Sequence, residues 1–363
     1  MASSASGLGP VLITGGCGFI GFHLVQKLLD ADSNCQIHVL DVDVSRNQIS
    51  PAVYHECDIS SLEAVEKAFQ QAHPRTVFHI ASPDSMVIRP ELFEKVNVGG
   101  TRNILSSAIK IGTVEAMVFT SSSSVIHDNV TDLIEADENL PILRPPIQKR
   151  VYTLTKATAE EMVLAANRKS GNASMLTVSL RPCTAIGEAD TVCLGKMFPR
   201  AAEGKMKFQM GNGQNIYDFV YVGNLVDAHI LAAQALLRDY GKPPPPADRR
   251  VDGENINITN DEHVLFWDFT RKVAAAAGYP VKKEEIVVIP TWVGLLMAWF
   301  SEWVAWIRGL QQPTMSYETI QLSTINRTMS VEKAKKVLGY RPTVSLDEGI
   351  QRGAKWYLDH KVT

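Results

Sequence analysis

The chain has 363 residues, and its 36 Lys and Arg residues nearly balance its 39 Asp and Glu residues, so the formal net charge is −3. This balance excludes a protein that binds nucleic acid through bulk positive charge. Hydrophobic residues make up 45% and charged residues 21%, which is typical of a globular protein and excludes extensive disorder. The length accommodates one large domain or two interleaved ones.

The cysteine pattern indicates reduced thiols rather than disulfides or a metal site. Their number is odd, no two are spaced as CxxC, and no His lies at metal-ligand spacing. The first ten residues are small and polar, without the basic and apolar regions of a secretion signal, so we expect a protein that faces the cytosol. The cysteines are Cys17, Cys35, Cys57, Cys183 and Cys193.

Short β-branched runs alternate with helical stretches through the first 180 residues. This alternation predicts an α/β fold, a doubly wound parallel sheet covered by helices. Residues 1–185 are expected to form this domain, with segment 218–260 returning to its sheet, and the rest of 186–363 a smaller, mostly C-terminal substrate-binding region. The expected strands are 11–14, 36–40, 53–57, 76–80, 116–121 and 175–181, and the expected helices are 18–30, 61–73, 90–111 and 152–169.

A glycine-rich turn, Gly15-Gly-Cys-Gly-Phe-Ile-Gly21, follows the first expected strand and opens a helix. Glycines permit the tight turn, the close approach of backbone N–H groups to a pyrophosphate, and packing of the helix against the strand. Asp41 follows 20 residues later, at the end of the second strand, where a carboxylate accepts the adenosine ribose hydroxyls. Its charge disfavours a 2′-phosphate, so the pattern predicts a Rossmann-type NAD site, although Arg46 nearby leaves NADP as an alternative.

Tyr152 and Lys156 lie four residues apart in an expected helix, so their side chains share one face. Oxidation of an alcohol needs a base for the hydroxyl proton, a group that holds the oxygen, and a cation that lowers the pKa of the base. A neighbouring ammonium favours the phenolate form of a tyrosine, which ordinarily titrates near ~10. The fifth strand ends in four serines, and Ser122 is the expected oxygen-binding hydroxyl, with Ser124 on the same face as the alternative.

These patterns resemble the extended short-chain dehydrogenases/reductases, specifically the 3β-hydroxysteroid dehydrogenase family and most closely its sterol-4α-carboxylate 3-dehydrogenase (decarboxylating) branch. The similarity covers nearly the whole chain. Besides the glycine turn and Asp41, the motifs that carry it are His79-Ile-Ala-Ser-Pro83, Asn97-Val-Gly-Gly-Thr101, Phe119-Thr-Ser-Ser122, Tyr152-Thr-Leu-Thr-Lys156, Leu180-Arg-Pro182, Asp218-Phe-Val-Tyr-Val222 and Leu338-Gly-Tyr-Arg-Pro342.

The resemblance implies a set of contacts with NAD and no metal. From the residues alone, Asp58 has an equal alternative as the N-cap of the helix that begins near Ser61. The implied contacts are Gly15, Gly18, Phe19, Ile20 and Gly21 at the pyrophosphate, Asp41 at the ribose, Asp58 and Ile59 at the adenine, Ala81 along the cofactor, Tyr152 and Lys156 at the nicotinamide ribose, and Pro182 beside the nicotinamide.

The resemblance also implies an activity: NAD-dependent oxidation of the 3β-hydroxyl of a sterol or triterpenoid 4α-carboxylate, with loss of CO₂, as in C-4 demethylation of sterols. Two alternatives remain open. The nearer is a 3β-hydroxysteroid dehydrogenase/isomerase, or a tailoring reductase of a specialised sterol or triterpenoid pathway. The more remote is a non-enzymatic NAD-binding scaffold.

A strongly apolar segment, residues 286–308, holds four of the six tryptophans. Pro290 and Glu302 argue against a membrane-spanning helix. Small and polar residues recur at helical spacing, and indole rings are typical of a membrane interface or an apolar substrate, so we expect peripheral membrane contact, with a core helix or a homodimer contact as alternatives. The resemblance implies the cytosolic face of the endoplasmic reticulum and contact with other sterol C-4 demethylation enzymes. The apolar face comprises Trp292, Val293, Leu296, Trp299, Trp303 and Trp306.

Overall fold

The computed structural model describes residues 7–87, 89–171, 173–309 and 315–360. Its main sheet has seven parallel strands in the order β11-β7-β5-β4-β1-β2-β3. The order reverses between β1 and β4, which is the switch point where open α/β sheets bind ligands. The strands are β1 (Val11–Thr14), β2 (Ile37–Asp41), β3 (Val53–Glu56), β4 (Thr76–His79), β5 (Ala116–Thr120), β7 (Leu176–Pro182) and β11 (Asn255–Ile258).

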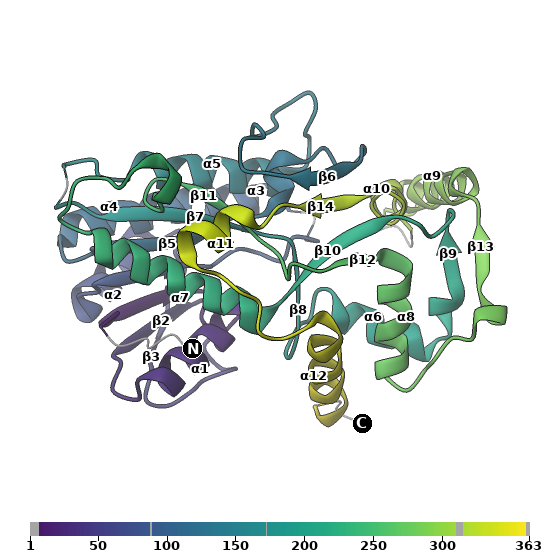
Figure 1. Ribbon diagram of the computed structural model, residues 1–363, viewed down its shortest axis with the longest axis horizontal. Coiled ribbons are helices and arrows are strands. Elements are labelled where there is room, and N and C mark those ends of the chain that lie inside the picture. The colour runs from purple at the N-terminus through teal and green to yellow at the C-terminus, as the bar shows by residue number, and fades with distance from the viewer. Residues whose placement is uncertain (1–6, 88, 172, 310–314, 361–363) are drawn as a thin grey trace.

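Helices cover both faces of the main sheet (Figure 1). Successive side chains of β1 point to opposite faces, so Val11 and Ile13 join one buried cluster and Leu12 joins the other. This double burial explains why the strand is apolar throughout. On one face lie α1 (Phe19–Ala31), α7 (Val222–Asp239) and α11 (Glu332–Leu338), and on the other α2 (Leu62–Ala72), α4 (Thr101–Ile111) and α5 (Val151–Ala165).

The six strands expected from the sequence occur within one residue of their expected bounds. The expected helix 90–111 differs, because it consists of α3 (Pro90–Phe93), the π-helical segment η1 (Glu94–Gly100) and α4. Within η1 the buried Asn97 donates from Nδ2 to Thr155 Oγ1 at 3.0 Å, which ties this helix to α5. Helix α5 ends four residues before the expected position 169.

A second region is built around a smaller sheet in the order β12-β10-β14-β6, with β8 also paired to β10 (Figure 1). Its strand β6 comes from within residues 1–185. Of segment 218–260, α7 packs on the main sheet and β11 forms its edge, whereas β10 belongs to the second sheet. The second sheet comprises β6 (Leu133–Ala136), β8 (Thr184–Ile186), β10 (Ile216–Tyr221), β12 (His263–Leu265) and β14 (Arg327–Met329).

Among the remaining elements, β9, β13 and α9 lie at the end of the molecule farthest from the main sheet, whereas α12 lies beside β8, nearer the middle (Figure 1). A two-stranded parallel ladder there leads directly into the apolar helix α9. The elements are α6 (Leu194–Ala202), β9 (Phe208–Met210), α8 (Phe266–Ala276), β13 (Val287–Ile289), α9 (Thr291–Ile307), α10 (Tyr317–Leu322) and α12 (Leu346–Asp359).

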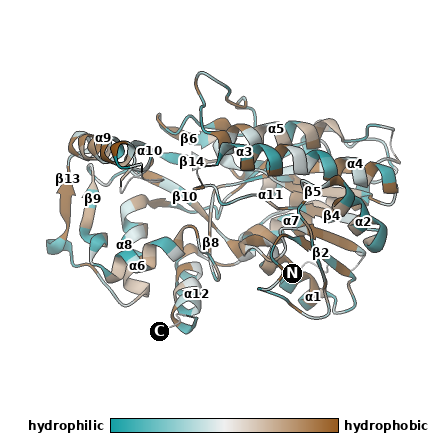
Figure 2. Cartoon of the chain, turned by 180° about the vertical axis from the view of Figure 1, so that it is seen from behind, coloured by the Kyte–Doolittle hydropathy of each residue, from teal (hydrophilic) through white to brown (hydrophobic). Residues whose placement is uncertain are grey.

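Helix α9 packs on the protein through its small residues. Gly294, Ala298 and Ala305 are buried, and a Cβ added to Gly294 would lie 2.9 Å from Met210 Sδ. The large apolar side chains point away from this contact, and Figure 2 shows α9 as a largely hydrophobic helix. We call these outward residues the tryptophan face; it comprises Trp292, Leu296, Met297, Trp299, Phe300, Trp303, Trp306 and Ile307, which are 45 to 79% exposed.

Helix α9 is 17 residues long, and no helix in the described part of the chain combines the length and apolar character needed to cross a bilayer.

Candidate active site

The glycine turn after β1 requires glycine for two steric reasons. Gly15 has a φ of +73°, and an added Cβ would lie 2.8 Å from the Cα of Ala81. A Cβ on Gly21 would lie 2.2 Å from the carbonyl oxygen of Gly15. Helix α1 begins at Phe19 and has no acidic residue in its first turn and no side-chain hydrogen bond at its N-cap, Gly18. This helix terminus is therefore suited to the pyrophosphate of a dinucleotide.

Asp41, the last residue of β2, lies beside this turn and is partly exposed. Its Oδ2 accepts a hydrogen bond from the backbone N–H of Cys17 at 3.0 Å, so the carboxylate is held against the glycine turn. Arg46, which could have favoured a 2′-phosphate, instead forms an exposed ion pair with Asp43 at 3.5 Å. The position of the Asp41 carboxylate beside the glycine turn therefore fits the ribose of NAD.

Asp58 closes the turn after β3. One of its oxygens accepts from the backbone N–H and the hydroxyl of Ser60, at 2.9 and 2.7 Å, and the other pairs with Lys95 Nζ at 3.0 Å. The N-cap of α2 is Ser61, so the alternative assignment of Asp58 as this cap is wrong. Ile59 is buried, and its Cδ1 lies 2.6 Å from a Cβ built on Gly100. Contact of Asp58 and Ile59 with adenine stays a prediction.

The remaining expected site residues gather at the carboxyl edge of the main sheet. Ala81 follows β4 and packs against the glycine turn, and Pro182 ends β7. The structure thus brings the expected residues to one edge: Gly15, Gly18, Phe19, Ile20 and Gly21 after β1, Asp41 at the end of β2, Asp58 and Ile59 after β3, Ala81 after β4, Ser122 after β5, Tyr152 and Lys156 on α5, and Pro182.

Ser122 is the serine that lies beside Tyr152. Burial raises the pKa of Tyr152, while hydrogen bonding to the Ser122 side chain and the charges of Arg150 and Arg327 lower this pKa. Strand β5 ends at Thr120, and Ser122 is the N-cap of a short 3₁₀ turn, η2 (Ser123–Ile126). Ser124 lies behind it, with the two hydroxyl oxygens 2.9 Å apart. This turn, rather than strand alternation, brings the two serines together.

Lys156 is buried and points toward the end of β5. Its Nζ donates to the carbonyl oxygen of Thr120 at 2.6 Å and lies 4.7 Å from the ring centre of Phe119. Burial lowers the pKa of Lys156 to about 7, against the opposing charge of Glu160. That Lys156 lowers the pKa of Tyr152 stays a prediction. Burial dominates the pKa of both groups, and the charges of Arg150 and Arg327 lower the pKa of the phenol.

Arg327 is the residue near the site that the sequence did not reveal. It lies in β14 and is 8% exposed. Its guanidinium donates from Nη1 to the Tyr217 hydroxyl at 2.7 Å and from Nη2 to Ser123 Oγ at 2.9 Å, one residue from Ser122. No local motif identifies Arg327, because β14 is far from the serine turn in the sequence. The two come together only because β14 is a strand of the second sheet.

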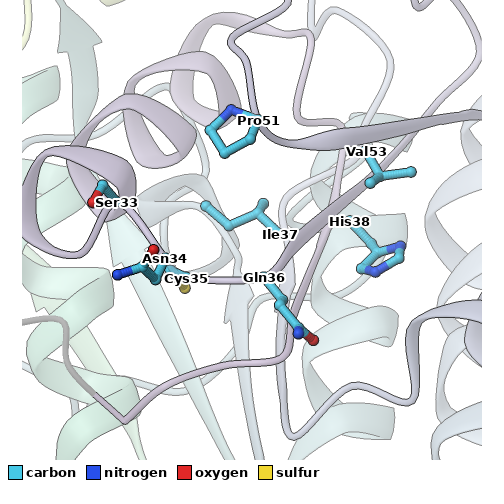
Figure 3. Close-up of a pocket in the computed structure, with 8 residues that line it drawn as sticks. All are labelled: Ser33, Asn34, Cys35, Gln36, Ile37, His38, Pro51 and Val53. Carbon is cyan, nitrogen blue, oxygen red and sulfur yellow. The ribbon is translucent and has the colours of Figure 1, made fainter.

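A separate pocket of about 370 Å³ lies at the opposite end of the main sheet. Figure 3 shows that it is lined by the segment that enters β2, including Asn34, Gln36 and His38, and by Pro51 and Val53 at the start of β3. These are the amino ends of the strands, so the pocket is remote from the site described above.

Sequence comparison with known proteins also indicates a dehydrogenase. The sequence model of the 3-beta hydroxysteroid dehydrogenase/isomerase family matches residues 12–289. The chain belongs to this family. The decarboxylating sterol-4-alpha-carboxylate 3-dehydrogenase of Saccharomyces cerevisiae is 36% identical to it, over 95% of this chain and 97% of the yeast protein. The human protein of the same name is 34% identical, over 94% of this chain and 86% of the human protein.

Solved structures confirm the predicted Rossmann-type fold. The UDP-glucose 4-epimerase of Thermus thermophilus, in complex with NAD, superposes with a TM-score of 0.69 and 25% identity, over 97% of this chain and 99% of the epimerase. The UDP-glucose 4-epimerase of Thermotoga maritima, solved with UDP-glucose, gives a TM-score of 0.70 at 23% identity, over 96% of this chain and 98% of the epimerase.

Proposed function

We infer that the protein is an NAD-dependent 3β-hydroxysteroid dehydrogenase of the decarboxylating type, which oxidises the 3β-hydroxyl of a 4α-carboxysterol to the 3-ketone with loss of CO₂. The observation that carries this inference is the pairing of Ser122 with Tyr152 at the switch-point edge of the sheet. Relatives that bear this name in yeast and human are 36 and 34% identical over nearly the whole chain.

NAD, when bound, supplies the acceptor for the hydride that leaves C3 of the sterol. The Tyr152 phenolate takes the proton of the C3 hydroxyl, and the Ser122 hydroxyl donates a hydrogen bond to the same oxygen. Burial opposes formation of this phenolate, whereas Ser122, Arg150 and Arg327 favour it. Ser122 and the two arginines therefore offset only part of the cost of burying the anion.

Oxidation creates a ketone next to the carboxylate-bearing C4. The bond between C4 and the carboxylate then breaks, its electron pair moves into the C3–C4 bond, CO₂ leaves, and the C3 oxygen becomes an enolate. Tyr152, which now carries the proton, and Ser122 are placed to donate hydrogen bonds to that oxygen. Protonation at C4 completes the reaction.

The test is Tyr152→Phe, assayed with NAD and a 3β-hydroxy-4α-carboxysterol. We expect kcat to fall about 10²- to 10⁴-fold with little change in the Kd for NAD, because the ring stays and only the proton acceptor is lost. Tyr279→Phe, at an exposed tyrosine outside the site, is the matched control. Near wild-type turnover of Tyr152→Phe would refute the assignment.

The family also includes dehydrogenase/isomerases, and oxidation without decarboxylation is the alternative activity. A panel of 3β-hydroxysterols with and without the 4α-carboxylate separates the two. Loss of CO₂ is read from the product mass, and NADH from its absorbance. Isomerised products of unchanged carbon number would favour the alternative, which extends to tailoring enzymes of specialised triterpenoid pathways. Absence of NADH with every sterol would favour the non-enzymatic scaffold.

We further propose that the protein binds peripherally to a membrane, at the cytosolic face of the endoplasmic reticulum, through the tryptophan face. Helix α9 buries its small residues against the protein and turns its large apolar side chains outward, which suits a helix lying in the plane of a lipid interface. Indole rings favour this position because their N–H groups reach the polar boundary. A homodimer and contact with other sterol C-4 demethylation enzymes stay predictions.

A further inference from the structure

A buried carboxylate extends the row that Tyr152 and Lys156 form along helix α5. Glu160 comes four residues after Lys156, so its side chain projects from the same face of the helix. The Glu160 side chain is 0% exposed, and the proton transfer described above does not use it. Carboxylates are almost never fully buried unless they are paired, so a carboxylate in this position requires specific partners.

Two residues of β7 hold the Glu160 carboxylate. Arg181 donates to it from Nε, at 3.1 Å to each oxygen, and also from Nη2 to Oε1. Ser179 donates from Oγ to Oε2 at 2.9 Å. Arg181 is only 2% exposed, so both charges of the ion pair are removed from water and each offsets the cost of burying the other. The pair also ties α5 to the strand that ends in Pro182.

Lys156 is buried one helical turn away and is bonded to a neutral oxygen rather than to a carboxylate. Its Nζ donates to the carbonyl oxygen of Thr120 at 2.6 Å. Burial lowers the pKa of Lys156 to about 7, and the charge of Glu160 acts in the opposite direction. An amine with this pKa is about half charged near neutral pH. The charge carried by Lys156 therefore depends on the Glu160 carboxylate.

Titratable groups approach Lys156 from α5 and β4, and from β7 through the ion pair. His79, at the end of β4, has its pKa lowered to about 3 by burial and by the charge of Lys156, so its ring is neutral at working pH. Tyr152, one turn earlier on α5, has its pKa raised by burial. Arg181 of β7 is paired with Glu160. Of these groups, Glu160 carries the negative charge that favours an ammonium at Lys156.

We propose that Glu160 is a positioning residue for the reaction, whose buried carboxylate keeps Lys156 in the ammonium form while Tyr152 accepts the proton of the substrate. The inference rests on the proposed function, because Lys156 acts there through its expected contacts with the nicotinamide ribose and the phenol. An ammonium favours the phenolate form of Tyr152, whereas a neutral amine has no charge with which to do so. Arg181 holds the carboxylate in place, so charges of alternating sign run from the reacting groups into the core.

The experiment compares wild type and Glu160→Gln from about pH 5.5 to about pH 8.5, with NAD and a 3β-hydroxy-4α-carboxysterol. Loss of the carboxylate should lower the pKa of Lys156 by about one unit. We therefore expect kcat/KM to be nearly equal in the two proteins at the acid end and about 10-fold lower in the variant at the alkaline end. Carbon-13 NMR of lysine labelled at Cε reads the Lys156 titration directly and without sterol, and Lys156→Met assigns the signal. This titration should move down by about one pH unit in Glu160→Gln.

Further variants separate the charge from the fold. Glu160→Gln leaves the Arg181 charge buried, so the double variant Glu160→Gln/Arg181→Met removes both charges and provides the measurement if the single variant does not fold. It should also lose activity at the alkaline end. Glu160→Asp keeps the charge and should keep the wild-type pH profile. Asp252→Asn is the matched control, because it removes the carboxylate that pairs with Arg168 at 2.6 Å beyond the far end of α5; it should lower the melting temperature and leave the pH profile unchanged.

An equal loss of kcat/KM at every pH, with an unchanged Lys156 titration, would overturn the inference in favour of a structural role for Glu160. A lower Lys156 titration without the alkaline loss of activity would also overturn it, because the charge of Lys156 would then not affect the reaction. Wild-type protein that releases NADH but no CO₂ from the carboxysterol would refute the proposed function and leave the NMR result intact. Thermal melting establishes that each variant is folded.

Discussion

Trp306 is the most exposed residue of the tryptophan face, and its replacement tests the membrane proposal without disturbing the core. Its exposed fraction is 79%. A tryptophan side chain offers up to about 250 Å² of surface, so roughly 200 Å² is available for burial in lipid. At about 25 cal/mol per Å² complete transfer would contribute about 5 kcal/mol. A helix lying in the interface immerses only its outer side, so we expect Trp306→Ser to cost about 2 kcal/mol, or about 30-fold in partitioning.

The assay is co-sedimentation of the purified full chain with phosphatidylcholine and phosphatidylethanolamine vesicles, at two salt concentrations. Leu358→Ser is the matched control, because Leu358 is 50% exposed and lies on α12, away from α9 (Figure 1). We expect the control to bind as wild type does and both variants to melt at the wild-type temperature. Unchanged vesicle binding of Trp306→Ser, or an equal loss in Leu358→Ser, would refute the reasoning.

Three further predictions follow from the site. Lys156→Met should abolish oxidation yet raise the melting temperature, more at pH 6 than at pH 9. The reason is that the pKa of Lys156 is about 7 in the folded chain and near ~10.4 when unfolded, so the unfolded chain binds more protons between these values and wild-type stability rises with pH there. Asp41→Ala should weaken NAD binding about 10-fold and NADP binding less, by fluorescence titration. Gly21→Ala should lower the melting temperature and abolish NAD binding, because its Cβ would overlap the Gly15 oxygen at 2.2 Å.

A specific result would contradict each of these three predictions. A lower melting temperature for Lys156→Met at pH 6 would contradict the burial argument. An equal loss of NAD and NADP in Asp41→Ala would mean that this carboxylate holds the turn rather than the ribose. Gly21→Ala is compared with Gly112→Ala, where an added Cβ meets nothing within 4 Å although φ is +72°, and equal NAD binding in the two variants would refute the steric argument.

Local sequence patterns determined the main sheet and the glycine turn, and they were enough to propose Tyr152 and Lys156 as the catalytic pair. The strand bounds followed from short apolar runs, because a strand covered on both faces is apolar throughout. Gly15, Gly21 and Asp41 were recognisable because the turn, the helix start and the proposed ribose contact lie within one βαβ unit. Tyr152 and Lys156 are neighbours on one helix, and their separation of four residues in the sequence is enough to predict this.

The tertiary structure alone decided the charge environment of the reacting groups. Ser122, rather than Ser124, faces Tyr152 because a 3₁₀ turn replaces the strand after Thr120. The pKa of Tyr152 rises because burial, which depends on every element packed around it, outweighs the nearby cations. Arg327 reaches the site through β14, which pairs with β6 and β10, and no sequence spacing encodes such long-range pairing. The chain's near-neutral total charge thus concealed a buried positive charge, that of Arg327, which acts on the tyrosine proposed as the proton acceptor.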